Sequence, residues 1–254
     1  MGFAYPTVMN EVCLDMAIAQ EILQISNWQP EEKHLQQFQQ LYTQIILKNK
    51  SSNLTGITEP QDFLEKHIWD AIAGISPLEI LGKEGEMKTA IDIGTGGGFP
   101  GIPIAIACPN YQITLLDSVR KKMLLLDEII TALNLQNVKT LIGRAEEIGQ
   151  DISQRESYDL VSIRAVASPS VCAEYALPLL KIGGIAILYR GQWQEEETEN
   201  LTPVVTKLGG QIKSIASFQT PLTNSIRHCI YLEKKVPTLP QYPRRVGIPT
   251  KHPL

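Results

Sequence analysis

The sequence offers few groups that could build a metal site, a disulfide framework or a membrane anchor. Four cysteines and four histidines are scattered along 254 residues, and no cysteine pair has the C-x-x-C spacing of metal and redox motifs. No apolar run approaches membrane-spanning length, and the first residues, MGFAYPTVMNEVCLD, lack a basic stretch followed by a hydrophobic one. We therefore expect a monomeric cytosolic protein without a metal site or a membrane anchor, and with reduced cysteines.

The charge balance excludes one class of nucleic-acid binder. The net charge is −4 at pH 7, so the chain cannot coat nucleic acid by bulk charge, although it can carry a local basic patch. The last twenty residues contain no acidic residue and four basic ones, which are Lys235, Arg244, Arg245 and Lys251. We therefore expect a basic face near the C-terminal end.

The first third of the chain has apolar residues at helical spacing. Pro30, followed by Glu31 and Glu32, is typical of a helix start. The predicted helices cover residues 7–26, 31–49 and 59–75. Together they predict a helical N-terminal extension over residues 1–84.

From residue 88 onward, short β-rich runs alternate with helical runs. Five such pairs are followed by two further β-rich runs, 211–220 and 228–235. This alternation predicts an α/β core over residues 85–235, with a seven-stranded, mostly parallel sheet whose last strand runs antiparallel. Residues 236–254 are then a basic, proline-containing tail packed on or near the core.

The stretch TAIDIGTGGGFPGIPIAIA, residues 89–107, places bare backbone between the first predicted strand and its helix. In an open parallel sheet, ligands bind beyond the carboxyl ends of the strands, where the strand order reverses. Glycines at this turn let the backbone approach a ligand, and the helix predicted from near Phe99 and Pro100 would offer free N–H groups to an anion. The glycines concerned are Gly94, Gly96, Gly97 and Gly98.

Two ligand classes fit this turn. Gly96, Gly98 and Gly101 satisfy the dinucleotide pattern G-x-G-x-x-G, and Asp117 follows at a distance suited to ribose hydroxyls. The other ligand is S-adenosylmethionine, and Asp92 favours it, because a carboxylate at the strand tip repels a pyrophosphate but can pair with an amino group.

A second acidic residue favours the same ligand. Ala145 and Glu146 follow the third predicted strand, where an acidic side chain can accept a hydrogen bond from an adenine amino group. Purely structural roles are the alternative: Asp92 would cap a turn, and Glu146 would begin a solvated helix.

Seven segments occur in an order that resembles the RsmG (GidB) family, bacterial methyltransferases of small-subunit ribosomal RNA. They are NLTGI, HIWDAI, IDIGTGGGFPGIPIAI, TLLDS, GRAEE, SIRAVAS and YPRRVGIPTKHPL. The glycine segment alone is shared by many methyltransferases, whereas the combination is far more specific. The resemblance covers nearly the whole chain.

The resemblance implies a class I, Rossmann-like methyltransferase fold with a helical N-terminal extension. It implies methyl transfer from S-adenosylmethionine to guanine N7 in the 530 loop of 16S rRNA, so that 16S rRNA or the small ribosomal subunit is the partner. The resemblance places Gly94, Phe99, Asp117, Ser118, Ala145, Glu146 and Arg164 at the cofactor, and we expect Asp92, Gly96, Gly98 and Val119 to join them. It implies basic positions at Lys121, Arg144 and Arg164 around the site, and we expect Lys122, Arg244, Arg245 and Lys251 to bind RNA with them.

Guanine N7 carries a lone pair and no proton, so this reaction needs no general base. We expect no acid–base residue, and we expect Arg144 and Arg164 to act by positioning. His67 and Asp70 lie three residues apart on one helical face, where they could pair and pack the extension over the cleft.

Three other functions remain open at this point. A nicotinamide-dependent oxidoreductase would use the G-x-G-x-x-G match, but the chain shows no second nucleotide-binding half. A non-catalytic RNA-binding protein would keep the fold without turnover. A small-molecule methyltransferase would leave the basic C-terminal end unexplained.

Overall fold

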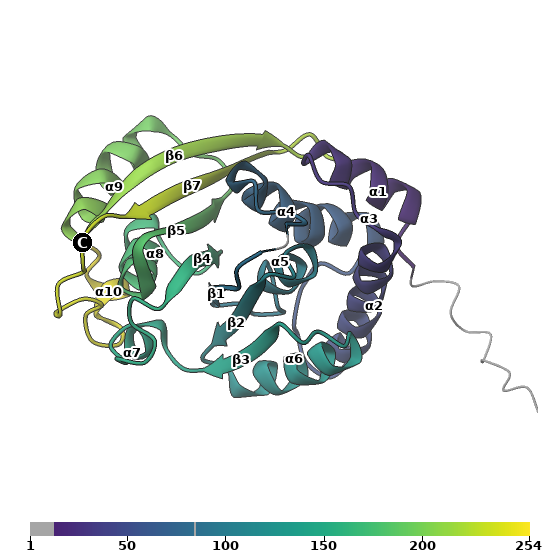
Figure 1. Cartoon of the computed structure of the whole chain (residues 1–254), viewed down its shortest axis with the longest axis horizontal. Helices are drawn as coiled ribbons and strands as arrows, with labels where there is room; N and C mark the ends of the chain where they lie inside the picture. The colour runs from purple at the N-terminus through teal and green to yellow at the C-terminus, as the bar shows by residue number, and fades with distance from the viewer. Residues whose placement is uncertain (1–12, 84) are drawn as a thin grey trace, which may run out of the picture.

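A seven-stranded sheet with the strand order β3-β2-β1-β4-β5-β7-β6 forms the centre of the molecule. The computed structural model describes residues 13–83 and 85–254 (Figure 1). Strands β1 to β5 pair in parallel, whereas β7 runs antiparallel to both β5 and β6. The strands are β1 Lys88–Ile93, β2 Tyr111–Asp117, β3 Val138–Ile142, β4 Tyr158–Arg164, β5 Leu180–Arg190, β6 Gly210–Gln219 and β7 Ile226–Lys234. The mostly parallel, seven-stranded sheet with an antiparallel last strand is confirmed.

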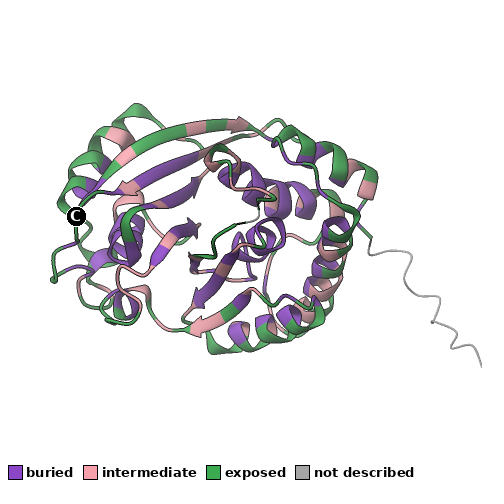
Figure 2. Ribbon diagram, in the orientation of Figure 1, coloured by how far each residue is buried: buried purple, intermediate pink, exposed green. Residues whose placement is uncertain are grey.

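Helices cover both faces of this sheet, and each face has its own buried core. Alternate residues of β1 enter different cores: Ala90 packs with the N-terminal helices, and Ile91 packs on the other face. Figure 2 shows the buried residues concentrated along the central strands and the inward helix surfaces. The helices of the α/β part are α5 Gly101–Ala107, α6 Arg120–Ala132, α7 Ala145–Ile148, α8 Pro169–Ala176, α9 Glu195–Lys207 and α10 Ile248–Lys251.

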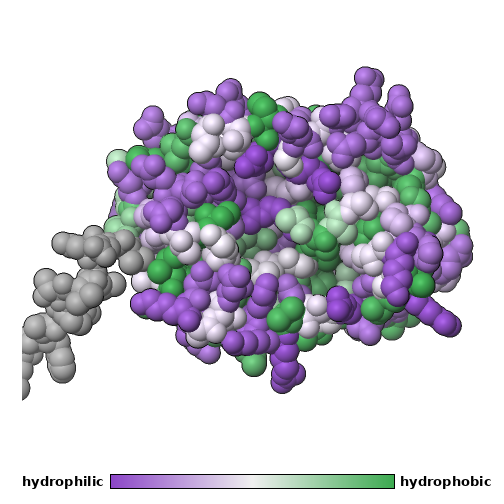
Figure 3. Space-filling model, turned by 180° about the vertical axis from the view of Figure 1, so that it is seen from behind, coloured by the Kyte–Doolittle hydropathy of each residue, from purple (hydrophilic) through white to green (hydrophobic). Residues whose placement is uncertain are grey.

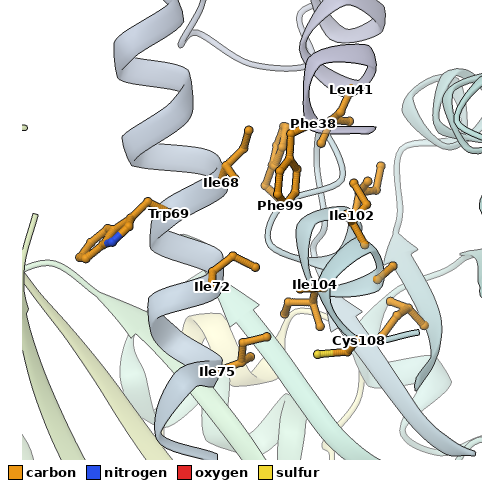
Figure 4. Close-up of a cluster of buried hydrophobic side chains, with 14 of the residues drawn as sticks. Phe38, Leu41, Ile68, Trp69, Ile72, Ile75, Phe99, Ile102, Ile104 and Cys108 are labelled. Atoms are coloured by element: carbon orange, nitrogen blue, oxygen red, sulfur yellow. The ribbon is translucent and has the colours of Figure 1, made fainter. Parts of the chain in front are cut away.

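The N-terminal helices pack on the same sheet face as α5 and α6. The helix predicted over 7–26 extends outside the described residues, and its described part is α1, Met16–Ile25. The helix predicted over 31–49 is confirmed as α2, Glu32–Asn49, which begins after Glu31 as the Pro-Glu-Glu pattern indicates. In Figure 4, side chains of α2 and of the following helical segment meet Phe99, Ile102 and Ile104 around α5. The extension therefore rests directly on the helix that follows the glycine turn.

The helix predicted over 59–75 is interrupted by one π-helical stretch. The structure has α3 Pro60–Phe63, then π-helical residues Leu64–Trp69, then α4 Asp70–Ile75. The buried Glu65 carboxylate in this stretch accepts hydrogen bonds from the N–H groups of Leu222 and Thr223, so the segment is tied to the β6–β7 loop. Such π-helical turns occur often at functional sites, and this one faces the tip of β4.

The glycine turn ends one helix position later than the sequence predicts. Helix α5 begins at Gly101, with Pro100 as its N-cap rather than in its first turn. The N–H groups of Gly98 and Phe99 both donate to Thr95 O, at 2.9 and 3.0 Å, so these residues form hydrogen-bonded turns before the helix.

The outer surface is chemically mixed. Figure 3 shows the face opposite to that of Figure 1, where hydrophilic side chains predominate and hydrophobic ones are scattered among them. Among the described residues, no helix combines the length and hydropathy needed to cross a bilayer. Within the same residues, no group of three or more His, Cys, Asp or Glu side chains could hold a metal ion.

Candidate functional site

A cavity of about 250 Å³ opens at the carboxyl ends of β1, β2, β3 and β4. This edge is where ligands bind in open α/β sheets, and the strand order reverses here, between β1 and β4. Of the predicted cofactor residues, five lie in its wall: Gly94, Asp117, Ser118, Ala145 and Glu146. The predicted positioning residue Arg144 lines it too. The remaining lining residues are Ile93, Leu116, Gly143, Val166, Ala167, Tyr175 and Thr250.

Asp117, at the end of β2, joins the glycine turn to the cavity. One carboxylate oxygen accepts a hydrogen bond from Gly96 N–H at 3.0 Å, and the other accepts from Val119 N–H at 2.9 Å. Each oxygen keeps a second lone pair, so the carboxylate can still accept ligand hydroxyls. Gly96 adopts a φ of +57°, in the left-handed region that favours glycine, which lets its N–H point to Asp117.

Asp92 lies beneath the turn rather than in the cavity wall. Its side chain is 1% exposed and accepts hydrogen bonds from Gly101 N–H at 3.0 Å and from the Ser162 hydroxyl at 2.9 Å. Burial raises the pKa of Asp92 to about 6, while these hydrogen bonds and Arg164 act in the opposite direction. The carboxylate therefore anchors the start of α5 to β1 and β4, which is the turn-capping alternative weighed for it.

Glu146 lines the cavity, but one of its carboxylate oxygens is already bound within the protein. Oε1 accepts hydrogen bonds from the Tyr175 hydroxyl at 3.1 Å and from Gly247 N–H at 3.0 Å. The side chain is 6% exposed and so is not the first residue of a solvated helix surface. The sequence predicted that Glu146 can accept from an adenine amino group, but it did not predict these two donors within the protein.

Arg164, at the tip of β4, turns away from the cavity and binds the N-terminal helical segment. Its guanidinium donates to Lys66 O at 2.7 Å, to Asp70 Oδ2 at 3.0 Å and to His67 Nδ1 at 3.0 Å. His67 and Asp70 thus meet at Arg164. Burial raises the pKa of Asp70 above its usual value, although Arg164 pulls that pKa down. Arg164 is a link between the two halves of the molecule, a role that the sequence did not predict.

The His67 ring extends this link to the glycine turn. It stacks on Phe99 with ring centroids 4.1 Å apart and an interplanar angle of 5°. Its Nε2 lies 2.7 Å from the Thr55 hydroxyl, so the NLTGI and HIWDAI segments meet here. Phe99 therefore supports the turn from behind rather than facing the cavity.

A second pocket of about 270 Å³ lies on the other side of the loop after β4. Arg164, Arg190 and Arg227 line it together with Asp70 and the backbone around Gly191. Ala165 lines this pocket while Val166 and Ala167 line the first, so this short loop separates the two. Arg190 and Arg227 were not among the residues predicted from the sequence; the signal was an arginine at the end of β5 and another at the start of β7.

The remaining predicted basic residues are dispersed. Lys121 Nζ donates to Ser51 O at 2.9 Å, and so it fastens the N-terminal loop to α6. Arg244 is bound to Glu174, with Nη2 to Oε2 at 2.6 Å. Lys122 is half-buried on α6, whereas Arg144, Arg245 and Lys251 are exposed. The side chains of Arg144, Arg245 and Lys251 are therefore exposed to solvent, where a partner could reach them.

The last three predicted cofactor residues differ in position. Gly98 is buried, and a Cβ built on it would lie 2.4 Å from Ile102 Cδ1, so it packs against α5. Gly96 lies in the turn, and its N–H donates to Asp117. Val119 is 45% exposed at the start of α6, and its N–H is the donor to Asp117.

Comparisons with known proteins identify the family of this chain. The GidB family model, described as rRNA small subunit methyltransferase G, matches residues 34–230. The ribosomal RNA small subunit methyltransferase G of Nostoc punctiforme is 54% identical over 231 residues, covering 91% of this chain and 95% of its own length. The protein of that name in Trichodesmium erythraeum is 56% identical over 229 residues, covering 90% of each chain.

A solved structure shares the fold at low sequence identity. The crystal structure of M. jannaschii TYW2 in complex with AdoMet aligns with a TM-score of 0.50 at 16% identity. The match covers 65% of this chain and 76% of that one. The α/β core therefore has the class I methyltransferase architecture.

Proposed function

This chain belongs to the ribosomal RNA small subunit methyltransferase G family, and on that basis we propose that it methylates N7 of a guanine in 16S rRNA. The methyl donor is S-adenosylmethionine, and the target lies in the 530 loop. One observation carries the proposal: the cavity bordered by Gly94 and Asp117 and the arginine-lined pocket lie on either side of one short loop after β4. Cofactor and nucleotide could thus approach each other there.

The cavity suits a nucleoside with a charged tail. Asp117 can accept both ribose hydroxyls on the lone pairs that Gly96 and Val119 leave free. Apolar groups of Leu116, Ala145 and Tyr175 provide a wall against which an adenine can pack. Asp92 acts indirectly, because it fixes the start of α5 and with it the glycine turn.

S-adenosylmethionine supplies an electrophilic methyl group on a sulfonium. The protein then needs to hold guanine N7 about 3–3.5 Å from that methyl and in line with the sulfur, and such positioning is worth about 7–11 kcal/mol. Since N7 carries no proton, no residue has to remove one. Positive charge grows on the purine during transfer, so an arginine against N7 would oppose the reaction.

The arginine-lined pocket can bind the RNA without that penalty. Arg190 and Arg227 would bind phosphate oxygens or guanine O6, to which arginine donates well in two-pronged geometry. The target must be unstacked or looped, because side chains cannot read the deep groove of an A-form helix. Exposed cations beside the cavity would hold the flanking backbone: Arg144, Arg245 and Lys251, with Lys122 as a half-buried neighbour.

The partner is therefore 16S rRNA or the small subunit that contains it. We place the enzyme in the cytosol, since ribosomal RNA is its substrate, and we propose that it acts as a monomer.

The test is transfer of labelled methyl from S-adenosylmethionine to undermodified small-subunit RNA, followed by digestion to nucleosides. The proposal predicts label in 7-methylguanosine, at one site of 16S rRNA. Label on another base atom would contradict the regiochemistry, and no transfer to RNA or to the subunit would contradict the activity. Calorimetric binding of NAD in place of S-adenosylmethionine would favour the oxidoreductase alternative.

A further inference from the structure

The C-terminal tail, expected from the sequence to pack on or near the core and to carry RNA-binding cations, reaches the wall of the cofactor cavity. Thr250, in α10, lines the cavity together with Ala145 and Tyr175. The sequence places Thr250 far from every other lining residue, so its position depends on how the tail is held. Three separate anchors hold it.

The strongest anchor is an ion pair with a fully buried partner. Glu174, in α8, is 0% exposed, and its carboxylate accepts hydrogen bonds from Arg244 N–H at 2.8 Å, Nε at 2.9 Å and Nη2 at 2.6 Å. A buried carboxylate bound this way to backbone and guanidinium fixes both the side chain and the chain direction at Arg244. The Nε and Nη2 donors of Arg244 are thus bound within the fold rather than open to RNA.

The second anchor connects the tail to the cavity wall itself. Gly247 N–H donates to Glu146 Oε1, which also accepts from the Tyr175 hydroxyl. Gly247 has a φ of +79°, which a glycine adopts without strain, and α10 begins directly after it. Glu146, in α7, thus binds both Tyr175 of α8 and Gly247, which directly precedes the helix that contains Thr250.

The third anchor holds the earlier part of the tail. Arg155 donates to the carbonyls of Tyr242 and Thr238, both at 2.7 Å, and Gln150 donates to Pro243 O at 2.7 Å. These bonds satisfy carbonyls of a proline-containing segment that has little regular structure of its own. The tail is therefore held along its length and not only at its end.

We infer that residues 244–251 place Thr250 in the wall of the cofactor cavity at its nucleoside end, as a positioning residue that borders the adenine. This inference rests on the proposed function, since it names the part of S-adenosylmethionine that the tail contacts. The nucleoside end is assigned because Gly247, three residues before Thr250, is bonded to Glu146, which follows β3 and also accepts from Tyr175. The tail thereby sets the affinity for the cofactor, and its exposed cations are free to contact RNA.

Two tryptophan variants of the full-length protein test this wall. Thr250→Trp places a large ring at the cavity, whereas His252→Trp places the same ring at an exposed tail position outside the lining residues. Calorimetry would measure the affinity of each for S-adenosylhomocysteine and for methylthioadenosine, which keeps the nucleoside but lacks the amino acid. We expect Thr250→Trp to weaken both ligands by at least about tenfold and by the same factor, and His252→Trp to change neither by more than about twofold.

Two glycine variants test whether a change in cofactor binding is only a consequence of lost stability. Gly247→Ala strains the turn before α10, and Gly183→Ala imposes the same kind of strain at a φ of +84°; neither new Cβ would meet another atom within 4 Å. Both variants should lose similar thermal stability, while only Gly247→Ala should raise KM for S-adenosylmethionine. A merely structural tail would leave that KM unchanged in both.

The outcomes separate the inference from the proposed function. Unchanged affinity in Thr250→Trp, or weaker S-adenosylhomocysteine binding with unchanged methylthioadenosine binding, would overturn the placement of the tail at the nucleoside. Wild-type protein that binds neither ligand would instead overturn the proposed function, and the inference with it.

Discussion

Arg164 donates a hydrogen bond from Nη2 to Nδ1 of His67 at 3.0 Å, and this contact joins the tip of β4 to the N-terminal helical segment. A guanidinium can only donate, so Nδ1 must accept, and the ring proton resides on Nε2, which faces the Thr55 hydroxyl at 2.7 Å. The neutral ring is therefore the form that the structure requires. Burial, with Arg164 as the second cause, lowers the pKa of His67 to about 3.

This depressed pKa predicts a pH dependence of stability. The unfolded chain binds a proton at His67 below about pH 6.5, while the folded protein resists it down to about pH 3, so stability falls as the pH falls through this window. His67 alone should contribute a slope of about 1.4 kcal/mol per pH unit. Urea unfolding of wild-type and His67→Gln protein between pH 6.5 and pH 4 measures the difference in slope, because other titrating groups are common to both. Parallel curves would contradict the assigned neutral histidine.

Substitutions of the adjacent tail residues Arg244 and Arg245 should differ in their effect on the unfolding free energy. Arg244→Ala leaves the fully buried Glu174 carboxylate without its partner, which should cost about 3–5 kcal/mol of unfolding free energy. Arg245→Ala removes an exposed side chain and should change that free energy by less than about 0.5 kcal/mol. Chemical denaturation measures both, and equal losses would refute the distinction between an anchored and a free arginine.

Arg245→Ala should in turn weaken RNA binding and flatten its salt dependence.

Arg227 should matter for RNA and not for the cofactor. Arg227→Ala removes one cation from the arginine-lined pocket, so we expect weaker RNA binding and a salt slope reduced by about one unit. Lys213→Ala is the control, because this exposed lysine lies near the amino ends of β1 and β4, at the opposite edge of the sheet. Filter binding across a salt series, with calorimetry for S-adenosylhomocysteine, gives both quantities. An Arg227→Ala protein that loses cofactor affinity but binds RNA normally would show that the two pockets are assigned the wrong way round.

Substitutions at two glycines of the turn, Gly101 and Gly96, should differ in their effect on cofactor binding. A Cβ at Gly101 would lie 2.3 Å from Leu115 Cδ2, so Gly101→Ala should destabilise the fold by about 1–3 kcal/mol. Around Gly96 the nearest atom to a built Cβ is Gly94 O at 3.9 Å, so the valine of Gly96→Val meets no close neighbour, but the φ of +57° strains it. Both variants should therefore lose stability, and only Gly96→Val should also block the approach of the cofactor to the turn. Melting temperature and calorimetry distinguish the two, and a Gly96→Val protein with wild-type cofactor affinity would contradict the site.

Local pattern was enough to predict the sheet and the turn. The parallel strands β1 to β4 are short apolar runs that alternate with helical runs, and this alternation indicates a mostly parallel sheet. The acidic residue at the end of β2 was found for the same reason, because a strand tip beside a glycine turn has a known place in the fold. Comparisons then identified the family that these motifs resemble.

Side-chain partners that come from distant segments could not be predicted in this way. Arg227 reaches the pocket only because β7 inserts between β5 and β6, which no local spacing encodes. Arg164 has the position expected of a substrate residue, yet the π-helical segment presents Lys66 O and Asp70 to it. The sequence alone cannot tell the adjacent Arg244 and Arg245 apart. The structure distinguishes them, because Arg244 binds the buried Glu174.

A crystal structure of the protein with S-adenosylhomocysteine bound would test the cofactor site most directly. We expect density in the cavity at the tips of β1, β2 and β3, with the ribose hydroxyls on Asp117 and the adenine between Ala145 and Thr250. Density for the ligand in another pocket, or a ribose that makes no contact with Asp117, would contradict it.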